Sequence, residues 1–388
     1  MRILTTLTYY RPHYSGLTIY AERLARALVE RGHQVTVITS RYDRNLPAKE
    51  RRDGVEVIRP GVLMHISKGV LMPSMPFRAW VNMRQADVIH LHLPQLDAAY
   101  IALLARLMGK PVVLTYHCDL LLPRGFIHSL ANQVSHLANK ISLGTARRVV
   151  VNTLDYAEQS DFLHRYLAKI SAIPTPVELV PPTQEDQEAV KHKAGLEPGQ
   201  RIIGMVARLA AEKGVEYLVE AMPEILKRHP KARVLHVGQY QNVLGEEEYA
   251  KKLKPMIQAL GGHWTFLGLL PPAELSAFYR LCELTVLPST NSTESFGIVQ
   301  VESMACGTPV VATDLPGVRQ PVRMTGMGRI VPVADAHALA ESICEVLDQP
   351  EHYRGDVEDV AKRFSSQHIA EQYEQVFQET VRGSRFDK

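Results

Sequence analysis

The sequence has few cysteines and no long apolar run. Its cysteines are Cys118, Cys282, Cys306 and Cys344, and no two of them form a Cys-x-x-Cys pair. This usage argues against a disulfide scaffold or a zinc site and is typical of reduced thiols in a cytosol. No apolar run reaches the ~18 residues of a membrane-spanning helix. The N-terminus turns polar directly after its first residues, so we expect no signal peptide and a cytoplasmic protein.

Two nucleotide-binding fingerprints are also missing. The chain has no G-x-G-x-x-G, which counts against a nicotinamide-dependent dehydrogenase, and no G-x-x-x-x-G-K-[ST], which excludes P-loop chemistry. No acidic D-x-D cage is evident, so we expect no metal and no other cofactor. A metal site built from His92, His117 and Asp119 is an alternative, but no H-E-x-x-H or other tight ligand spacing supports it.

Charge is distributed unevenly along the chain, although the net charge is only +3. Residues 1–180 contain 22 Lys or Arg and 13 Asp or Glu, whereas residues 181–388 contain 22 and 28, so the halves carry +9 and −6. The basic half favours an anionic surface or ligand on the N-terminal side, unless scattered solvated charge explains the difference. The small net charge predicts no nucleic-acid partner.

Strands and helices alternate along the chain. In the first half, hydrophobic periodicity predicts strands at residues 2–6, 34–39, 86–92, 111–116 and 148–152, and helices at residues 20–30 and 98–108. In the second half it predicts a helix at residues 214–228 and strands at residues 201–206, 233–237, 264–267, 284–287 and 309–312. This alternation is typical of parallel sheets with helices on both faces.

A proline-rich stretch, residues 173–182, separates the two series and resists helix formation, as expected for a linker. We therefore predict an α/β protein of two Rossmann-like, doubly wound domains, residues 1–178 and 183–366, facing a central cleft. A last helix, about residues 367–388, is expected to cross back to the N-terminal domain.

The most informative segment is Glu294-Ser295-Phe296-Gly297-Ile298-Val299-Gln300-Val301-Glu302, in which seven residues separate two glutamates. Eight residues of helix rise ~12 Å, whereas the carboxyls of a retaining hydrolase lie ~5 Å apart. The pair instead suits the two ends of a long nucleotide-sugar, with the Ile298 and Val299 amides at the diphosphate. The alternative is one loop glutamate and one helix-surface glutamate with no common ligand.

Other candidate residues lie where a predicted strand ends. Arg208 and Lys213 precede a helix N-terminus, where their charges favour phosphate binding, although a solvated loop is the alternative. Gly16 follows the first strand and opens a helix, so its backbone can approach a phosphate closely. His117 follows another strand, at the edge where doubly wound sheets bind ligands.

Together these segments resemble the family 4 glycosyltransferases, which are retaining enzymes of the GT-B fold, and the resemblance runs nearly end to end. It is carried by the Gly16 loop, Asp87-Val88-Ile89-His90, Thr115-Tyr116-His117, residues 204–214, the E-x7-E segment and Met304-Ala305-Cys306-Gly307-Thr308-Pro309-Val310-Val311-Ala312. The chain departs from many relatives in having Ser15-Gly16 in place of two adjacent glycines, and in the basic Arg319 after the late strand.

The resemblance implies a role for each matching position. Arg208 and Lys213 would hold the diphosphate and stabilise it as the leaving group. Glu294 would bind the donor sugar and Glu302 the nucleotide ribose. The remaining donor contacts would come from Gly16, Ser295, Phe296, Gly297, Ile298 and Val299. His117 would lie near the C6 side of the sugar and the acceptor.

The implied activity is transfer of a hexosyl group from a UDP- or GDP-sugar to a glycan or lipid-linked acceptor. Retention without a metal is expected, and the departing phosphate takes the acceptor's proton. The alternatives are a nucleotide-sugar-binding protein without turnover, and a GT-B epimerase or phosphorylase; no candidate pyridoxal-phosphate lysine pocket favours the phosphorylase.

Residues 65–80 mix apolar side chains with cations. Such a segment can lie on an anionic bilayer surface, or it can fold inward with Phe77 and Trp80 in the core. The first interpretation predicts a lipid-linked acceptor and peripheral attachment at the inner face of the membrane.

Overall fold

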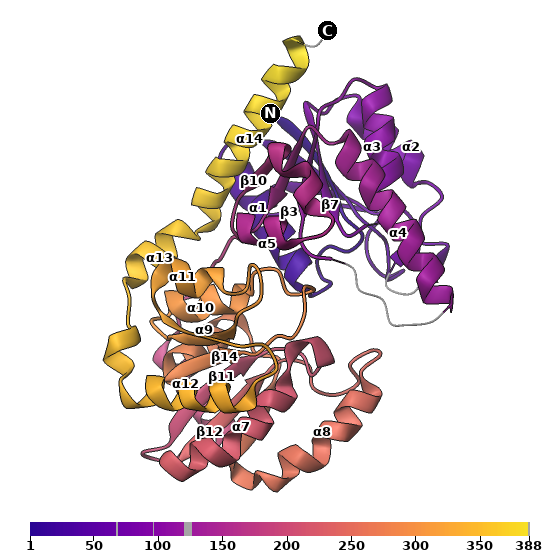
Figure 1. Ribbon diagram of the computed structural model, residues 1–388. Helices are drawn as coiled ribbons and strands as arrows, with labels where there is room; N and C mark the ends of the chain where they lie inside the picture. The colour runs from indigo at the N-terminus through magenta and orange to yellow at the C-terminus, as the bar shows by residue number, and fades with distance from the viewer. Residues whose placement is uncertain (67–68, 96, 120–125, 387–388) are drawn as a thin grey trace. The chain divides into compact units, whose positions relative to one another are not determined.

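The computed structural model describes residues 1–66, 69–95, 97–119 and 126–386 (Figure 1). The chain forms two compact units, Met1–Pro176 with Phe364–Lys388, and Val177–Arg363. Each unit is built around one mainly parallel β-sheet with helices on both faces, which confirms the α/β fold class.

The sheet of the first unit has the strand order β10-β9-β8-β7-β1-β2-β4-β3. Its strands are β1 (Arg2–Thr6), β2 (Gln34–Ile38), β3 (Lys49–Arg52), β4 (Val55–Ile58), β7 (Val88–Leu93), β8 (Val112–Tyr116), β9 (Arg148–Val151) and β10 (Ile170–Ala172). Only β3 is antiparallel to its neighbour in this sheet, while β5 (Met64–Ile66) and β6 (Gly69–Leu71) form a separate hairpin. Because β1 pairs with both β2 and β7, the strand order reverses there, which creates a switch point.

Helices cover both faces of this sheet because successive strand residues point to opposite sides. Ile3 and Val88 pack in the same core cluster as residues of α1 (Gly16–Glu30) and α14 (Ser366–Phe386). Leu4 and Ile89 pack in the opposite cluster, against helices α2 (Met75–Met83), α3 (Ala98–Leu107), α4 (Phe126–Thr145) and α5 (Leu154–Gln159).

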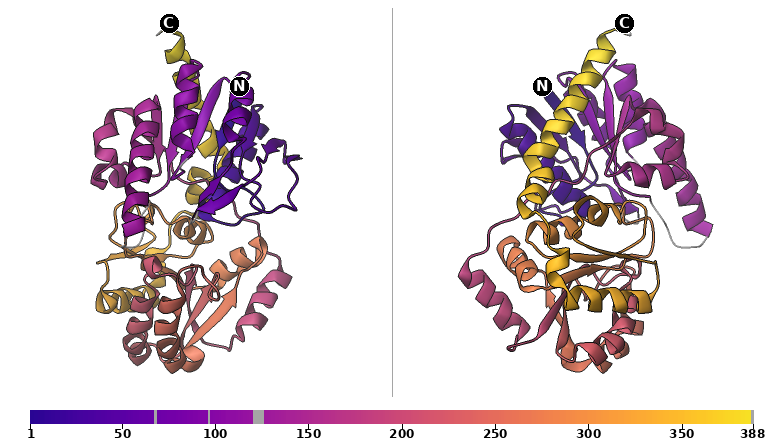
Figure 2. Two further views of the ribbon diagram at one scale, coloured as in Figure 1. Left: turned by 90° about the vertical axis from the view of Figure 1, so that its right-hand side faces the viewer. Right: turned by 60° about the vertical axis from the view of Figure 1, so that its left-hand side comes forward.

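The C-terminal helix returns to the N-terminal unit, as predicted. α14 packs along α1 (Figure 2). The hydroxyls of Tyr20 and Tyr373 lie 2.6 Å apart in the core. Helix α1 begins four residues earlier than the sequence pattern predicts. Ser15 caps it, since the Thr18 amide donates to Ser15 Oγ and the Ser15 amide donates to Thr18 Oγ1.

The sheet of the second unit is parallel throughout, with the order β13-β12-β11-β14-β15-β16. Its strands are β11 (Arg201–Val206), β12 (Ala232–Val237), β13 (Trp264–Gly268), β14 (Leu284–Leu287), β15 (Val310–Thr313) and β16 (Gly328–Val331). In chain order this is the 3-2-1-4-5-6 arrangement of a dinucleotide-binding domain, with the switch point between β11 and β14.

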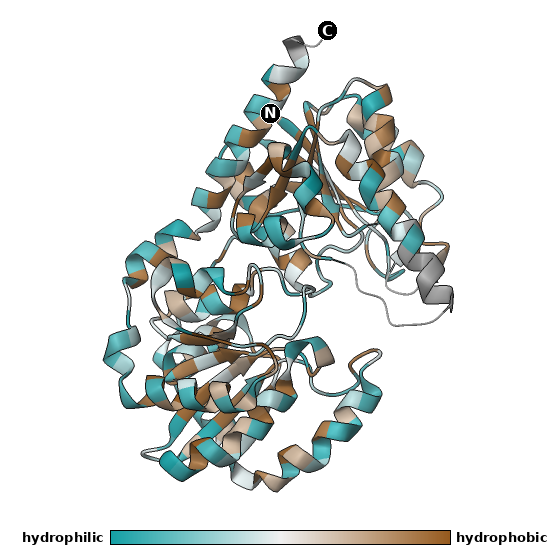
Figure 3. Ribbon diagram, viewed as in Figure 1, coloured by the Kyte–Doolittle hydropathy of each residue, from teal (hydrophilic) through white to brown (hydrophobic). Residues whose placement is uncertain are grey.

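The helices of this unit are α6 (Gln184–Ala194), α7 (Val215–Arg228), α8 (Glu247–Ala259), α9 (Pro272–Leu281), α10 (Ile298–Ala305), α11 (Gln320–Thr325), α12 (Ala336–Asp348) and α13 (Val357–Arg363). The proline-rich stretch before α6 contains no helix, as predicted. The strands are hydrophobic and the outward helix faces largely hydrophilic (Figure 3). Within the described ranges, no helix combines the length and apolar composition needed to cross a membrane.

Candidate functional site

Two loops meet at the switch point of the second unit. One follows β11 and carries Arg208 and Lys213, and the other follows β14 and carries Glu294. The Thr290 amide of the second loop donates to the Glu212 carbonyl of the first over 3.0 Å. Gly214 packs so tightly that a Cβ there would lie 2.0 Å from the Pro288 carbonyl oxygen. The loops are therefore held against each other at the sheet edge where doubly wound folds bind ligands.

Lys213 and Glu294 form an ion pair between these loops. Lys213 Nζ lies 2.5 Å from Glu294 Oε2, and the two side chains are 21% and 17% exposed. The other carboxylate oxygen of Glu294 accepts the Gly297 amide over 3.0 Å. Glu294 is thus held in place by a cation and by the turn that starts α10, with both groups still reachable from solvent.

Gly297 forms the N-cap of α10 in the left-handed conformation, with φ +77°. A Cβ at this position would lie 2.4 Å from Leu287 Cδ2, so only glycine fits. Because the helix begins at Ile298, only four residues of helical rise, ~6 Å, separate its start from Glu302. The prediction that all eight residues from Glu294 to Glu302 are helical was therefore wrong. The first amides of α10, those of Ile298 and Val299, have no partner within the helix and form the positive end of its dipole.

Arg208 pairs with Glu212, a residue to which the sequence pattern gave no role. Their side chains are in direct contact, Arg208 being 40% and Glu212 16% exposed. An acid four residues after an arginine suggests such a pair within a helix. Here Arg208 lies before the 3-10 turn Ala211–Lys213 that contains Glu212, so the loop and not a helix brings the two side chains together. Arg208 therefore has an internal anion where a ligand phosphate is expected to bind.

Glu302 is buried, with 6% exposure, so the alternative of a helix-surface glutamate is wrong. The Tyr279 hydroxyl of α9 donates to Glu302 Oε2 over 3.2 Å. Burial raises the pKa of Tyr279, and the Glu302 charge raises it further, so this hydroxyl stays a donor. Glu302 is consequently an oriented acceptor inside the unit.

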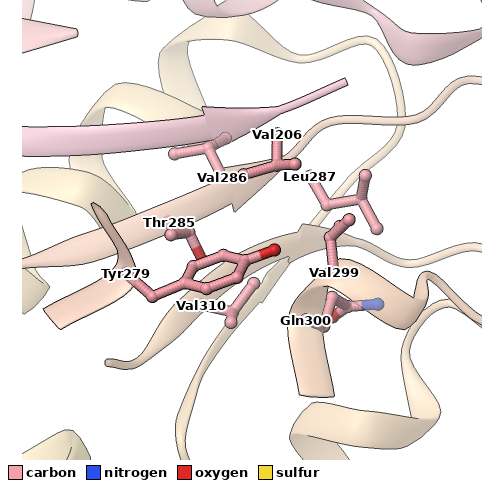
Figure 4. A pocket seen from close by; sticks show the side chains of 8 residues that line it. All are labelled: Val206, Tyr279, Thr285, Val286, Leu287, Val299, Gln300 and Val310. Carbon is pink, nitrogen blue, oxygen red and sulfur yellow. The ribbon is translucent and has the colours of Figure 1, made fainter. Parts of the chain in front are cut away.

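The side chains of Ser295 and Phe296 also face the interior, with 7% and 2% exposure. A small gap with a mostly aliphatic lining lies beside the first turn of α10 (Figure 4). It is lined by Val206, Tyr279, Thr285, Val286, Leu287, Val299, Gln300 and Val310. The space has no room for a water molecule, and the charged loop residues do not line it, so it is a packing gap and not a ligand pocket.

In the first unit, His117 belongs to a buried histidine cluster. His117 Nε2 lies 2.8 Å from His92 Nδ1, the two rings stack, and the Tyr20 ring meets His117 edge-on. Burial lowers the pKa of His117 to about 3 and that of His90 to about 3. These imidazoles are therefore neutral at physiological pH.

The alternative metal site is not assembled. The Asp119 carboxylate accepts the Tyr116 hydroxyl over 2.8 Å, while His92 and His117 bond to each other. Across residues 1–66, 69–95, 97–119 and 126–386, no three His, Cys, Asp or Glu side chains are grouped to hold a metal ion.

Gly16 opens α1 at the switch point of the first unit and is exposed. A Cβ there would meet nothing within 4 Å, so packing inside the chain does not require a glycine. Ser15, which stands where many relatives have another glycine, is the helix cap. Arg319, the other departure, forms an ion pair with Asp314 at 3.1 Å.

Comparison with known proteins identifies both halves of the chain. Residues 186–363 match the profile of the glycosyl transferases group 1, and residues 15–176 match the glycosyl transferase 4-like domain. D-inositol 3-phosphate glycosyltransferase of Thermobispora bispora is 30% identical over 87% of this chain and 82% of the relative. Phosphatidyl-myo-inositol mannosyltransferase of Mycobacterium tuberculosis is 28% identical over 79% and 77%.

The fold has close counterparts among solved structures. The crystal structure of HepE from Anabaena in complex with UDP-glucose matches with a TM-score of 0.75, covering 98% of this chain and 100% of that chain. At 21% identity this likeness concerns the fold alone.

Proposed function

Because this chain belongs to the family 4-like, group 1 glycosyltransferases of the GT-B fold, we propose that it uses a nucleotide-diphosphate sugar as donor. A hexosyl group passes to a glycan or lipid-linked acceptor, and the anomeric configuration is retained. The observation that carries this proposal is the Lys213–Glu294 ion pair, which places a cation and a carboxylate together at the switch point. The cation can bind a diphosphate, and the carboxylate can accept hydrogen bonds from the hydroxyls of a sugar.

In this mechanism Arg208, Lys213 and the N-terminus of α10 stabilise the charge that develops on the departing diphosphate. Glu294 accepts hydrogen bonds from the donor sugar, and Glu302, oriented by Tyr279, accepts them from the ribose. The acceptor attacks from the side on which the diphosphate leaves, and the departing phosphate takes the acceptor's proton. His117 is proposed to lie near the C6 side of the sugar and the acceptor, and Gly16 to contact the donor. No metal takes part in the proposed reaction.

The donor base is proposed as uracil in preference to guanine, since the structure of HepE contains UDP-glucose. We propose that the acceptor binds to the N-terminal unit, because residues 1–180 carry +9 and all but the last four of them belong to that unit. One relative is named for a lipid, phosphatidyl-myo-inositol. We place the protein in the cytoplasm, with peripheral attachment to the inner membrane face.

Two measurements test this function. A panel of UDP- and GDP-sugars is incubated with the protein, and release of free nucleotide and sugar is followed. We expect slow hydrolysis of one donor without an acceptor and faster turnover when a suitable acceptor is added. NMR of the first product formed gives the anomeric configuration, and an inverted anomer would contradict retention. A protein that binds a donor tightly and never releases sugar would instead be a nucleotide-sugar sensor.

A further inference from the structure

Helix α2 has two apolar faces, although only one of them is covered. Met75, Ala79 and Met83 are fully buried and pack in the core beneath the helix. On the other side, Phe77 is 62%, Trp80 40% and Val81 39% exposed. Their spacing of three and four residues places them on one stripe, which is the pattern of a helix face that contacts an apolar partner. The alternative that Phe77 and Trp80 fold into the core is therefore wrong.

The exposed aromatic rings lie beside one another and beside a cation. The Phe77 and Trp80 rings are 6.1 Å apart, and the Arg84 guanidinium lies over the Trp80 ring at 5.2 Å. Arg78 is exposed on the same helix. Among the described residues, neither Arg78 nor Arg84 pairs with a carboxylate. The face thus combines exposed aromatic rings with two arginines, one of which lies over the Trp80 ring.

The hairpin before α2 adds further exposed apolar side chains. Leu63, Met64 and Leu71 are 68%, 50% and 41% exposed, and Met64 is directly opposite Leu71 in the β5–β6 pairing. Three residues lie between Leu71 and Met75, the first residue of α2, so the two are at most ~14 Å apart. Ser67 and Lys68, part of the segment singled out from the sequence, lie outside the described residues.

Charge selects the partner of this surface. From Val57 to Ala86 the sequence has no Asp or Glu and four Lys or Arg. Arg59 is buried and paired with Glu50, and Lys68 lies outside the described residues, so Arg78 and Arg84 are the cations described on this face. A protein partner with an ordinary mixed surface would not call for such one-sided charge. A bilayer with anionic lipids meets both requirements, since it accepts aromatic rings at the headgroup level and attracts cations.

We propose that the outer face of α2, with the exposed side chains of Leu63, Met64 and Leu71, docks on an anionic lipid bilayer. Phe77 and Trp80 insert at the interface, and Arg78 and Arg84 contact the lipid phosphates. Docking would bring the enzyme to its proposed lipid-linked acceptor, and this is the one point at which the inference rests on the proposed function. Vesicle binding is measured without any donor, so it can fail while sugar transfer succeeds, and the reverse.

Tryptophan fluorescence gives a direct test because the sequence has only two tryptophans. Trp264 is 6% exposed in the core of the second unit, whereas Trp80 lies on the proposed face. With phosphatidylcholine vesicles containing phosphatidylglycerol and brominated acyl chains, we expect quenching of the wild-type protein. Trp80→Phe should keep vesicle binding and lose the quenching. Binding without quenching of Trp80 would overturn the proposed location.

Flotation separates the contributions of rings and charges. Phe77→Ser/Trp80→Ser should abolish binding, whereas Leu244→Ser/Leu269→Ser, which removes two exposed leucines of the second unit, should leave it unchanged. Arg78→Gln and Arg84→Gln should each weaken vesicle binding roughly fivefold, because each substitution removes one cation. The charge control is Lys251→Gln/Lys252→Gln on α8.

The remaining outcomes contradict the proposal. They are equal recovery with neutral and anionic vesicles, or binding untouched by ~0.5 M salt, where the Debye length is about 4 Å. A dimer in sedimentation that Phe77→Ser/Trp80→Ser dissociates, without vesicle binding, would assign this face to a second copy of the chain. Unchanged thermal unfolding of each variant shows that its fold is intact.

Discussion

Lys213 Nζ lies 2.5 Å from Glu294 Oε2, although 81 residues separate the two in the sequence. The contact joins the loops that follow β11 and β14. These two strands are neighbours at the switch point, where the order of strands across the sheet reverses. Glu294 also accepts the Gly297 amide, so one carboxylate links the cation to the start of α10. The sugar-binding and phosphate-binding groups of the proposed site are therefore mechanically connected.

Glu294→Ala should abolish transfer and largely spare nucleotide binding, because the proposed contacts of Glu294 are with the sugar. Glu294→Gln keeps an acceptor for the Gly297 amide and should disturb the fold less, yet remain slow. Turnover and the thermal shift caused by a nucleoside diphosphate measure the two effects separately. Glu341→Ala, on the exposed face of α12, is the control. Near-normal turnover of Glu294→Ala would refute its assignment.

Lys213→Ala and Arg208→Ala should each cost roughly 2–4 kcal/mol of transition-state stabilisation, the scale of removing a key charge stabiliser. Charge accumulates on the diphosphate as it departs, so kcat should fall as well as the affinity for donor. Lys227→Ala, an exposed lysine in the last turn of α7, is the matched control. Kinetics unchanged from the wild type would show that the loop is only structural.

Glu212→Gln should strengthen the binding of nucleoside diphosphates two- to fivefold. The diphosphate has to replace Glu212 as the partner of Arg208, and a partly exposed ion pair of this kind is worth about 0.5–1 kcal/mol. Calorimetric titration with UDP and GDP measures the change. In an Arg208→Ala background the same substitution should have no effect. Weaker binding would mean that Glu212 holds Arg208 in its working orientation.

Activity should survive removal of divalent metals by EDTA, because two side-chain cations and a helix N-terminus match the diphosphate charge. The measurement is the transfer rate before and after dialysis against EDTA, with metal-saturated EDTA as control. Loss of activity that Mg²⁺ or Mn²⁺ restores would contradict the metal-independent mechanism.

Stability should fall as the pH drops from about 6.5 toward 3. Burial lowers the pKa values of His90 and His117 to about 3, and that of His92 falls too, while an unfolded histidine titrates near 6.5. The unfolded chain therefore binds more protons in this window, and the stabilisation is complete only above it. The loss is up to ~1.4 kcal/mol per pH unit for each histidine.

Urea unfolding between pH 5 and 7.5, where ordinary carboxylates stay ionised, tests this dependence. His117→Gln should unfold with a shallower pH dependence than the wild type, even if it is less stable overall. A slope that is the same in both proteins would show that His117 is not a source of the effect.

Much of the site could be predicted from the sequence because its signals are local. Aliphatic runs ending at Val206 and Leu287 identified β11 and β14, and the positions of Arg208, Lys213 and Glu294 directly after them were apparent. The glycine before Ile298 likewise indicated a helix start. Such patterns depend on neighbours a few residues away, so no knowledge of the fold was needed.

Other features depended on contacts between distant segments. Hydrophobic periodicity placed the start of α1 at Tyr20, because the Ser15–Thr18 cap depends on hydrogen bonds that periodicity does not report, whereas the expectation that Gly16 opens a helix is confirmed. Glu302 looked like a possible surface residue until the structure placed it against Tyr279 of α9. Phe77 and Trp80 had two equally reasonable positions, and the packing of Met75 and Met83 decided between them.

The sequence by itself determined the α/β class, the parallel strands and the residues that end them, since hydrophobic spacing dictates which side of each element is buried. Tertiary structure alone decided which of those residues meet. The pairing of Lys213 with Glu294 follows from the strand order, which places β14 beside β11 even though two other strands come between them in the chain. Strand order depends on the packing of the whole sheet against its helices, and no local pattern encodes it.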